Sequence, residues 1–342
     1  MKYLQGKEYF DFKILDGEIR EPGENEILVR VNACGVCGSD VHLLKRSKEY
    51  VPLGHEISGV VAAVGKSVTV AGIGDTVIVE DVTLCGVCED CKNGNMHLCK
   101  NMYNLMGQSG MGEYLVVREN SVDRYWDMDP VSASLTEPLA VALNTFFAAD
   151  LPPAGNIVIY GIGVLGIMCA RLARYFGASK IVCVGSNPDS NRNKARCAAA
   201  LKMGADAVLY ENVNDAESDI VNIFGGRKAD AVIVTSPPKT LLRAIKKAKY
   251  GAKVVVIGLE FSGGAKVEID LDGLIFNKNA IIPVLAEPAK NFPLSIKLLQ
   301  SKVVDASLLV THTFTLDDAR YLRELYTNDE PVIKAVLVNG NI

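Results

Sequence analysis

The sequence has no long apolar run, no concentration of basic residues and no internal repeat or low-complexity tract. None of its stretches approaches the roughly 18 uninterrupted apolar residues of a membrane-spanning helix. Its first residues, MKYLQGKEYFDF, lack the apolar core of a secretory signal. Lysine and arginine are scattered, and the net charge is −4, which argues against a dedicated nucleic-acid surface. These absences predict a soluble, cytoplasmic protein that binds neither membranes nor nucleic acid.

The cysteines are the most informative residues present. The chain has 342 residues, enough for two domains of about 100–200 residues each, and nine cysteines. Because a reducing compartment disfavours disulfides, clustered cysteines there more often bind metal. Cys169, Cys183 and Cys197 lie scattered in apolar or helical context and are expected to be inert packing residues. The remaining cysteines fall in two segments, 32–42 and 83–99, and each segment contains Cys-Gly-Val-Cys.

The chain changes character after Leu151-Pro152-Pro153. Before this point, short alternating or apolar segments with glycine-rich turns predict β-strands at 25–32, 57–64, 76–80 and 113–118. After it, six apolar segments alternate with helical patterns, including helices over 163–176 and 238–249. The six are NIVIY, KIVCV, DAVLY, DAVIV, KVVVIG and AIIPVLA. This alternation predicts a parallel sheet covered on both faces. Two more helices are predicted at 291–301 and 315–325.

The second Cys-Gly-Val-Cys copy belongs to a four-cysteine loop with the spacing C-x2-C-x2-C-x7-C. Its cysteines are Cys85, Cys88, Cys91 and Cys99. Four thiolates so close in sequence fit a tetrahedral zinc site with every ligand from the protein and no open position. An iron–sulfur cluster also takes four thiolates, but the spacing differs from ferredoxin runs and no proline follows the last cysteine. We predict a structural zinc; His97 lies in the loop, but the cysteines already complete the ligand set.

The first Cys-Gly-Val-Cys copy has no second cysteine pair near it in the sequence. It is followed by polar residues of other kinds, namely Ser39, Asp40, His42, His55 and Glu56. A thiolate, an imidazole and a carboxylate form a mixed set of the kind that leaves a coordination position open at catalytic zinc. Alone, His55 would more often be a buried structural histidine and Glu56 a surface charge. Their position after CGVCGSD favours a metal site.

Five segments together resemble the zinc-containing medium-chain alcohol and polyol dehydrogenase family. They are CGVCGSDVH, GHEISGVV, the four-cysteine loop, TEPLAVALN and YGIGVLG, in the family's order and over nearly the whole chain. The resemblance implies an α/β protein with a GroES-like, β-rich catalytic domain (1–140 and 286–342). The second domain (141–285) would be a Rossmann domain with a doubly wound, parallel six-stranded sheet. A homodimer or homotetramer is also implied, and the segment AIIPVLA could extend a sheet across a dimer.

The resemblance also assigns the catalytic zinc ligands. It implies that Cys37 is the thiolate ligand and His55 the imidazole ligand, whereas Cys34 is not a ligand. The carboxylate partner is either Glu56 or Glu137, directly or through water, and both stay candidates. Members for simple alcohols carry a cysteine where this chain has Glu137, so the glutamate favours polyols or sugar-derived alcohols.

The same resemblance assigns the proton path. Zinc acts as a Lewis acid on the substrate hydroxyl. Ser39 takes the hydroxyl proton and hands it on, through the cofactor ribose, to His42 at the solvent edge. Asp40 is expected to orient the His55 imidazole. One departure concerns the segment between the ligands: 18 positions separate Cys37 from His55, which is short for the family. Because this loop borders the substrate cleft in relatives, substrate identity does not transfer.

A dinucleotide fingerprint opens the second half. Gly161, Gly163 and Gly166, with Val164 and Leu165 between them, follow a predicted strand directly and begin a predicted helix. This context supplies the tight turn and the close approach to pyrophosphate that dinucleotides require.

The residues after the next predicted strand indicate whether the dinucleotide is NAD or NADP. Gly185 stands where an NAD enzyme carries an acid, and Ser186, Asn187 and Arg192 follow. This resembles the Gly-Ser-Arg-Pro pattern of NADP-dependent members, with Asn187 in place of arginine. NADP is therefore favoured over NAD, unless a rearranged turn brings in Asp189.

The leading hypothesis is a zinc-dependent alcohol or polyol dehydrogenase that transfers hydride between a secondary alcohol, polyol or sugar alcohol and NAD(P). A simple alcohol or aldehyde dehydrogenase and a zinc-free reductase of the same superfamily are the rivals among enzymes. A zinc-ribbon binding module is the rival from another class, and the fingerprint and net charge oppose it.

Overall fold

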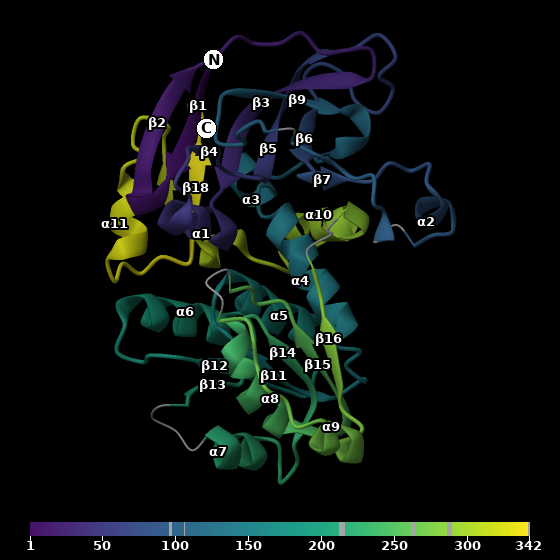
Figure 1. Ribbon diagram of the computed structural model, residues 1–342, viewed down its shortest axis with the longest axis vertical. Coiled ribbons are helices and arrows are strands. Elements are labelled where there is room, and N and C mark those ends of the chain that lie inside the picture. Colours follow the sequence, from purple (N-terminus) through teal and green to yellow (C-terminus); the bar gives the residue numbers. More distant parts are fainter. Residues whose placement is uncertain (96–97, 106, 212–215, 261–263, 286–288, 341–342) are drawn as a thin grey trace. The chain divides into compact units, whose positions relative to one another are not determined.

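The structure is a computed structural model that describes residues 1–95, 98–105, 107–211, 216–260, 264–285 and 289–340. The chain forms two compact units (Figure 1). Unit 1 comprises Met1–Ala140, Glu287–Lys302 and Val310–Ile342, and unit 2 comprises Val141–Ala286 and Val303–Leu309. The sequence division placed 303–309 in the first domain. They pack with unit 2 instead, where Arg171 donates to the carbonyl of Val303.

Unit 1 is organised around the long strand β3. It lies in a seven-stranded sheet of order β10-β6-β5-β3-β18-β17, with β9 also paired to β3. The strands are β3 (Glu26–Gly35), β5 (Glu56–Val64), β6 (Thr76–Val79), β9 (Tyr114–Arg118), β10 (Val122–Arg124), β17 (Val310–Phe314) and β18 (Lys334–Val338). One edge of β3 pairs with β5, and the other pairs first with β9 and then with β18. The apolar residues Ile27, Val29 and Val31 are fully buried in the core.

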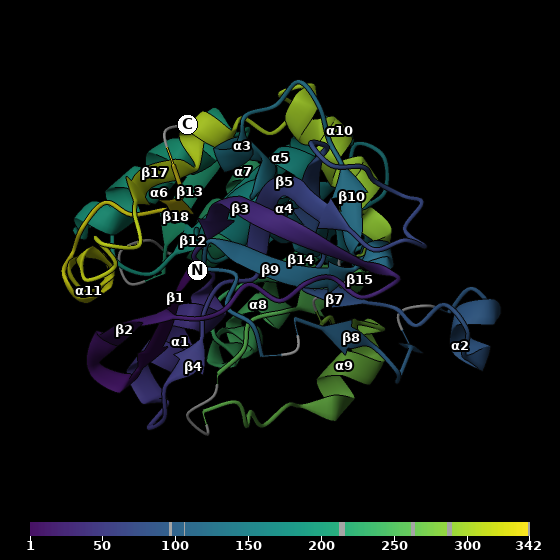
Figure 2. The same ribbon diagram turned by 90° about the horizontal axis from the view of Figure 1, so that it is seen from above.

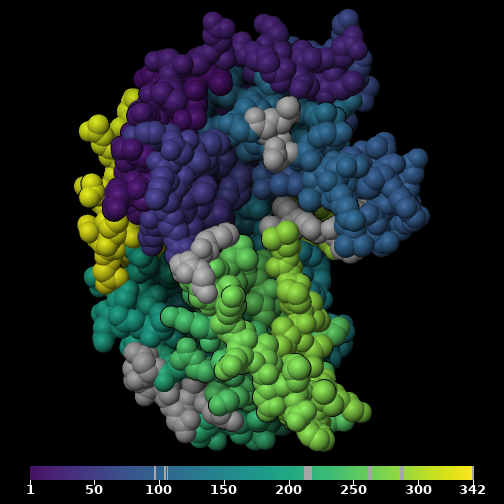
Figure 3. Space-filling model, viewed as in Figure 1, coloured from purple at the N-terminus to yellow at the C-terminus, as the bar shows by residue number. Residues whose placement is uncertain are grey.

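Smaller elements surround this sheet. A three-stranded sheet joins β1 (Lys2–Lys7), β2 (Asp11–Asp16) and β4 (Val51–Pro52), and β7 (Val82–Thr83) pairs with β8 (Tyr103–Asn104). The helices are α1 (Gly38–Arg46), α2 (Glu89–Lys92), α3 (Pro130–Ala133), the start of α4 (Thr136–Ala148), α10 (Phe292–Gln300) and α11 (Tyr321–Thr327). Figure 3 shows that the part of the chain around α2, in blue, projects from unit 1.

Unit 2 is a parallel sheet of six strands in the order β13-β12-β11-β14-β15-β16 (Figures 1 and 2). The strands are β11 (Asn156–Tyr160), β12 (Lys180–Gly185), β13 (Ala207–Tyr210), β14 (Ala229–Val234), β15 (Ala248–Val256) and β16 (Ala280–Pro283). The helices are α5 (Val164–Tyr175), α6 (Asn191–Lys202), α7 (Ala216–Ile223), α8 (Leu241–Lys247) and α9 (Leu271–Asn277). This strand order is that of a doubly wound dinucleotide-binding sheet, so the predicted parallel sheet is confirmed.

Two predicted helices are shorter than expected. The one predicted over 238–249 begins as a 3-10 turn at Pro238–Thr240, continues as α8 and ends at Lys247, where β15 starts. The one predicted over 315–325 begins only at Tyr321. Before it, the Thr315 hydroxyl donates to the Asp318 carboxylate at 2.8 Å and closes a turn. Among the described helices, none has both the length and the apolar character needed to cross a bilayer.

The glycines at the start of α5 differ in how tightly they are packed. A Cβ on Gly166 would lie 1.9 Å from the carbonyl oxygen of Gly161, whereas a Cβ on Gly163 would meet nothing within 4 Å. Gly166 therefore permits α5 to approach the turn after β11, and Gly163 leaves open space beside the helix N-terminus.

We expect Gly166→Ala to lower the free energy of unfolding by about 1–3 kcal/mol, because backbone must move to admit the methyl group. Gly163→Ala is the matched control and should stay within about 1 kcal/mol of the parent, since only the helix N-cap changes. Urea unfolding followed by circular dichroism measures both. Equal midpoints for Gly166→Ala and the parent would contradict the close packing.

Candidate functional site

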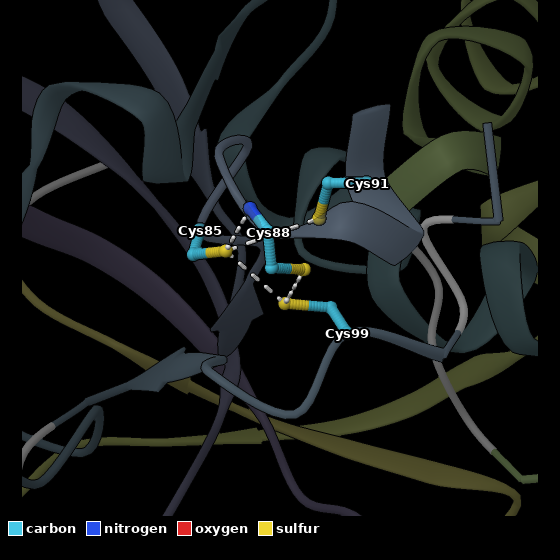
Figure 4. A group of neighbouring side chains, drawn as sticks. All are labelled: Cys85, Cys88, Cys91 and Cys99. Atoms are coloured by element: carbon cyan, nitrogen blue, oxygen red, sulfur yellow. Dashed lines mark hydrogen bonds between the residues drawn. The ribbon is translucent and has the colours of Figure 1, made fainter. Parts of the chain in front are cut away.

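The four-cysteine loop brings its sulfur atoms together. Figure 4 shows the four sulfurs pointing at one another from the segment that contains α2. The Sγ of Cys85 lies 3.6 Å from that of Cys99 and 4.0 Å from that of Cys91, and the Sγ atoms of Cys88 and Cys99 are 3.9 Å apart. Four sulfurs around one zinc, each at about 2.3 Å, would stand about 3.8 Å apart. Disulfides would need about 2.05 Å. The arrangement fits one tetrahedral ion.

The pKa values of the cysteines in this loop are also consistent with a bound cation. The backbone N–H groups of Val87 and Cys88 point at the Cys85 sulfur and lower its pKa to about 6. Partial burial and the neighbouring thiols raise the pKa of Cys91 to about 12. Four thiolates cannot coexist here without a compensating charge, which a divalent ion would supply. A multinuclear cluster would place several metal and sulfide atoms between the thiolates, so these short distances favour a single ion. His97 lies outside the described residues.

The second cluster lies where β3 ends and β5 begins. Cys37 is the N-cap of α1, just after β3, and His55 immediately precedes β5. Ligand atoms of Cys37, His55 and Glu56 all lie within 4.8 Å of one another. Because β3 and β5 pair antiparallel up to Gly35 and Glu56, the two segments leave the sheet at the same end. The fold thus brings together residues about twenty positions apart, as the mixed site requires.

Asp40 ties these two segments together through their backbone. Its Oδ2 accepts from the Cys37 N–H at 2.9 Å and its Oδ1 from the Gly54 N–H at 3.0 Å. The His55 Nδ1 lies 4.0 Å from Oδ1, too far for a hydrogen bond. Burial lowers the pKa of His55, but the bond to Cys37 and the charge of Asp40 outweigh burial and leave the pKa well above its ordinary value. Asp40 therefore holds both ligand-bearing segments and acts on the imidazole by charge.

Ser39 and His42 lie on the first turns of α1, beside Cys37. They are three residues apart, so they share one side of the helix. Both are partly exposed. Both residues therefore lie at the partly exposed side of the helix that Cys37 caps.

The two candidate carboxylate ligands differ in their position: Glu56 belongs with Cys37 and His55 to the group of ligand atoms within 4.8 Å of one another, whereas Glu137 is not part of that group. Glu56 and Glu137 are both buried, the latter in the first turn of α4. Burial and the charges of Asp81 and Glu56 hold the pKa of Glu137 well above its usual range, although His55 opposes them. Asp81 was not predicted from the sequence; burial raises its pKa too, and its buried Oδ1 has no hydrogen-bond partner in the described structure.

One buried cation faces this group. Lys334 of β18 donates to both carboxylate oxygens of Glu56 at 2.6 Å. Burial lowers the pKa of Lys334, but Glu56 outweighs burial and keeps the pKa above its ordinary value. Within the described residues, the remaining acids Glu137 and Asp81 have no ion pair with lysine or arginine, and their raised pKa values reflect the cost of ionising them in this buried site. A divalent ion held by Cys37, His55 and a carboxylate would offset that cost, so the residues fit zinc.

Cys34 is buried in the apolar core of unit 1 and packs against Gly54. Burial raises its pKa well above the ordinary value, which keeps it a neutral thiol. The metal-competent group of the described residues contains Cys37 but not Cys34.

The dinucleotide fingerprint has the conformation that its glycines require. Gly161 follows β11 with φ of 105°, a region that favours glycine, and Gly163 is the N-cap of α5. Val164 and Leu165 form the first turn of the helix. The open space beside Gly163 would admit a pyrophosphate at the positive end of the helix dipole.

At the end of β12, an aromatic ring occupies the space that a carboxylate side chain at position 185 would need. A Cβ on Gly185 would lie 2.7 Å from the Tyr210 ring. Ser186 and Asn187 follow in an exposed loop, which the Asn193 side chain holds by donating to the Asn187 carbonyl at 2.8 Å. Arg192, in the first turn of α6, is partly exposed.

Two acids near the end of β12 differ in whether their carboxylate oxygens are already engaged. Asp189 lies exposed in the same loop. Glu211, just beyond β13, accepts from the Tyr160 hydroxyl at 2.8 Å and pairs with Arg243 at 2.7 Å. Its two oxygens are thus already engaged.

Comparison with known proteins gives two family matches. The model described as alcohol dehydrogenase GroES-like domain matches residues 23–125, and that described as zinc-binding dehydrogenase matches residues 164–301. Sorbitol dehydrogenase of Bacillus subtilis is 32% identical over 323 residues, 91% of this chain and 89% of that protein. L-threonine 3-dehydrogenase of Bacillus velezensis is 30% identical over 309 residues, 86% of each chain.

Solved structures share the fold over the whole chain. A proposed zinc-binding dehydrogenase of Sinorhizobium meliloti, bound to NADP, has a TM-score of 0.88 and 25% identity, and the match covers 99% of both chains. The 2R,3R-butanediol dehydrogenase of Bacillus subtilis has a TM-score of 0.86 and 23% identity, also over 99% of both chains.

We expect Cys91→Ser to remove one of about two zinc ions per chain and to expose the loop 85–99 to proteolysis, because the ion takes the place of a core there. Cys197→Ser, in α6, is the control and should retain both ions. Elemental analysis and limited trypsin digestion measure these outcomes. An unchanged zinc content in Cys91→Ser would refute the tetrathiolate site.

Proposed function

The chain belongs to the zinc-dependent medium-chain dehydrogenase family, and from this we propose that it transfers hydride between the secondary hydroxyl of a polyol or similar polar alcohol and NADP. The family matches confirm the GroES-like and Rossmann fold class, and they identify the chain as an alcohol or polyol dehydrogenase rather than a binding module. The observation that carries the proposal is the cluster of Cys37, His55 and the buried Glu56.

The substrate class follows from the relatives and from the carboxylates. Sorbitol and threonine, named in two relatives, are both secondary alcohols with polar groups beside the reacting carbon. Glu137 is an acid where members for simple alcohols carry a cysteine. A site rich in buried carboxylates suits a substrate with several hydroxyl groups, since each hydroxyl can donate a hydrogen bond.

Cys37, His55 and one of the two glutamates would hold the catalytic zinc. Bound zinc would lower the pKa of the substrate hydroxyl, and bound NADP would accept the hydride. Ser39 would accept the hydroxyl proton while passing its own to the ribose of the bound cofactor, and His42, at the partly exposed side of α1, would take it on to solvent. Asp40 keeps Cys37 and His55 in register through the Cys37 and Gly54 amides. Cys85, Cys88, Cys91 and Cys99 would hold a second, structural zinc.

Gly161, Gly163 and Gly166 would receive the pyrophosphate at the N-terminus of α5. At the other end of the dinucleotide, Ser186, Asn187 and Arg192 would surround a 2′-phosphate. Tyr210 fills the space where an acid on Gly185 would stand, and Glu211 is already paired. A relative at 25% identity that is bound to NADP supports this choice.

The oligomer proposed is a homodimer formed through β16. This strand pairs only with β15, so one edge is open among the described strands. The adjoining α9 exposes Leu271, Ile275 and Phe276. An open strand edge next to exposed apolar side chains suits pairing with a second copy.

We expect Cys37→Ala to lower kcat for sorbitol or threonine oxidation by at least about 1,000-fold, because the catalytic zinc is lost. Cys34→Ala is the matched control from the same tetrapeptide and should keep both its zinc and most of its turnover. Steady-state kinetics and zinc analysis of both variants provide the measurement. Comparable losses in the two variants would contradict the assignment, as would full activity in Cys37→Ala.

We expect kcat/KM to be at least about tenfold higher with NADP than with NAD, since one ion pair with the 2′-phosphate contributes about 1.4 kcal/mol or more. Ser186→Asp should reverse this preference by repelling the phosphate. Ser179→Asp, at the opposite end of β12, is the control and should leave the preference unchanged. A higher kcat/KM with NAD in the parent protein would show the cofactor assignment to be wrong.

A further inference from the structure

A basic hollow lies in unit 2 where the strands β14 and β15 begin. Its volume is about 290 Å³. The residues that line it are Arg227, Lys228, Asp230, Lys249 and Tyr250. They come from two segments that are separate in the sequence, and the parallel pairing of Ala229 with Ala248 brings these segments side by side. The fold thus gathers charged residues that the sequence keeps apart.

The hollow is separate from the dinucleotide fingerprint. All strands of a parallel sheet run in the same direction, so their starts lie at one edge of the sheet and their ends at the other. Gly161 follows the end of β11, whereas Arg227 and Lys228 precede β14 and Lys249 is near the start of β15. Dinucleotides bind beyond the carboxyl ends of the strands. The hollow therefore stands at the opposite edge of this sheet.

A bulge in β15 forms one wall of the hollow. Between Ala229 and Ala231 of β14, the paired residues of β15 run from 248 to 253, so β15 carries extra residues there. The bulge contains Gly251, whose φ of 76° is in the region that favours glycine. Lys249 and Tyr250 lie on the bulge and are exposed. Bulges of this kind redirect side chains, and here they place a cation and an aromatic ring at the hollow.

Positive charge exceeds negative charge in the hollow, because three lining residues are cations and one is an acid. The acid is already engaged: Asp230 accepts from the Asn156 N–H at 2.7 Å and forms an ion pair with Lys249. Burial raises the pKa of Asp230, but these contacts and the charge of Arg227 outweigh burial and hold the pKa below its ordinary value. Asp230 therefore offsets one cation, and the charges of Arg227 and Lys228 remain in excess.

Contacts with helix ends account for only part of these two side chains. The Arg227 Nε lies 3.5 Å from the carbonyl oxygen of Phe224, just after α7, and Lys228 donates to the carbonyl of Lys246 in α8 at 2.9 Å. Cations are favourable at helix C-termini. A guanidinium has five N–H donors, however, and the terminal nitrogens of Arg227 have no hydrogen bond or ion pair within the described part of the chain.

We propose that this hollow binds a small phosphate monoester, with the phosphate at Arg227 and Lys228 and the organic group at Tyr250. Arginine forms paired hydrogen bonds with phosphate oxygens, and lysine adds a point charge. The Tyr250 ring is 59% exposed, and the Nζ of Lys278 lies 5.5 Å from its centroid, so a further cation borders the hollow. Typical small-molecule pockets measure about 300–1,000 Å³, and a volume at the lower limit suits a small ester rather than a dinucleotide. The proposal does not depend on the catalytic zinc.

Phenyl phosphate tests the proposal, because it joins a phosphate to a ring that can stack on tyrosine. Its affinity and that of inorganic phosphate are measured by isothermal titration calorimetry in excess NAD and NADP, which fill the cofactor site. We expect a Kd for phenyl phosphate below about 1 mM in the parent. No binding at concentrations up to about 10 mM would overturn the proposal.

The residues of the hollow are then changed singly. Arg227→Gln should weaken phenyl phosphate binding at least about tenfold, because the paired hydrogen bonds to phosphate are lost. Arg20→Gln, the same change at an exposed arginine of unit 1, is the control and should bind within about twofold of the parent. Equal affinities in Arg227→Gln and the parent would show that the anion binds elsewhere.

Two further variants separate the effect of charge from that of stacking and of misfolding. Asp230→Asn should strengthen binding at least about threefold, because an opposing charge is removed, and misfolding cannot produce such a gain. An unchanged or weaker affinity in this variant would contradict the hollow as the binding site. Tyr250→Ala should weaken phenyl phosphate binding at least about threefold and leave inorganic phosphate within about twofold. Unchanged phenyl phosphate binding there would overturn the role of the ring.

Discussion

The pairing of β3 with β5 on one side and β18 on the other is the constraint on which the candidate active site depends. These strands come from the beginning and the end of the chain, and each contributes a residue at the same end of the sheet. Cys37 follows β3, His55 and Glu56 stand at the start of β5, and Lys334 begins β18. Backbone register, fixed by buried apolar side chains, therefore sets which ligand and which counter-ion meet.

Charge balance explains why the two Cys-Gly-Val-Cys copies differ. The four-cysteine loop has little core of its own, and its four sulfurs stand at the separation of a tetrahedral metal complex. In the first copy, Cys34 points into the apolar core and only Cys37 reaches the polar cluster. There the acids outnumber the single buried lysine, so a divalent ion is the natural complement. The same tetrapeptide thus belongs to a site with four protein ligands in one place and to a site with a free coordination position in the other.

The alternation of short strands and helices was enough to predict the six-stranded parallel sheet, because buried parallel strands are continuous apolar segments. The glycines of the fingerprint could also be placed from the sequence, because the conformation of the turn and of the helix start that follows it fixes their spacing. Helix ends were less predictable: a turn closed by Thr315 and Asp318 delays α11, and β15 begins where the helical pattern still continued. Side-chain hydrogen bonds and sheet pairing decide such boundaries, and neither has a periodic signal.

The sequence by itself determined the fold class and the family, because each of the motifs that indicate them is a short segment of the chain. Cys85 to Cys99 form one loop, and Gly161 to Gly166 one turn. Only the tertiary structure decided what surrounds them. Lys334 lies 278 positions from Glu56, and Asp81 joins the cluster from another strand end. Tyr210 occupies the space beside Gly185 from a neighbouring strand. Contacts of this kind arise from strand order and register, which a linear pattern of residue types does not specify.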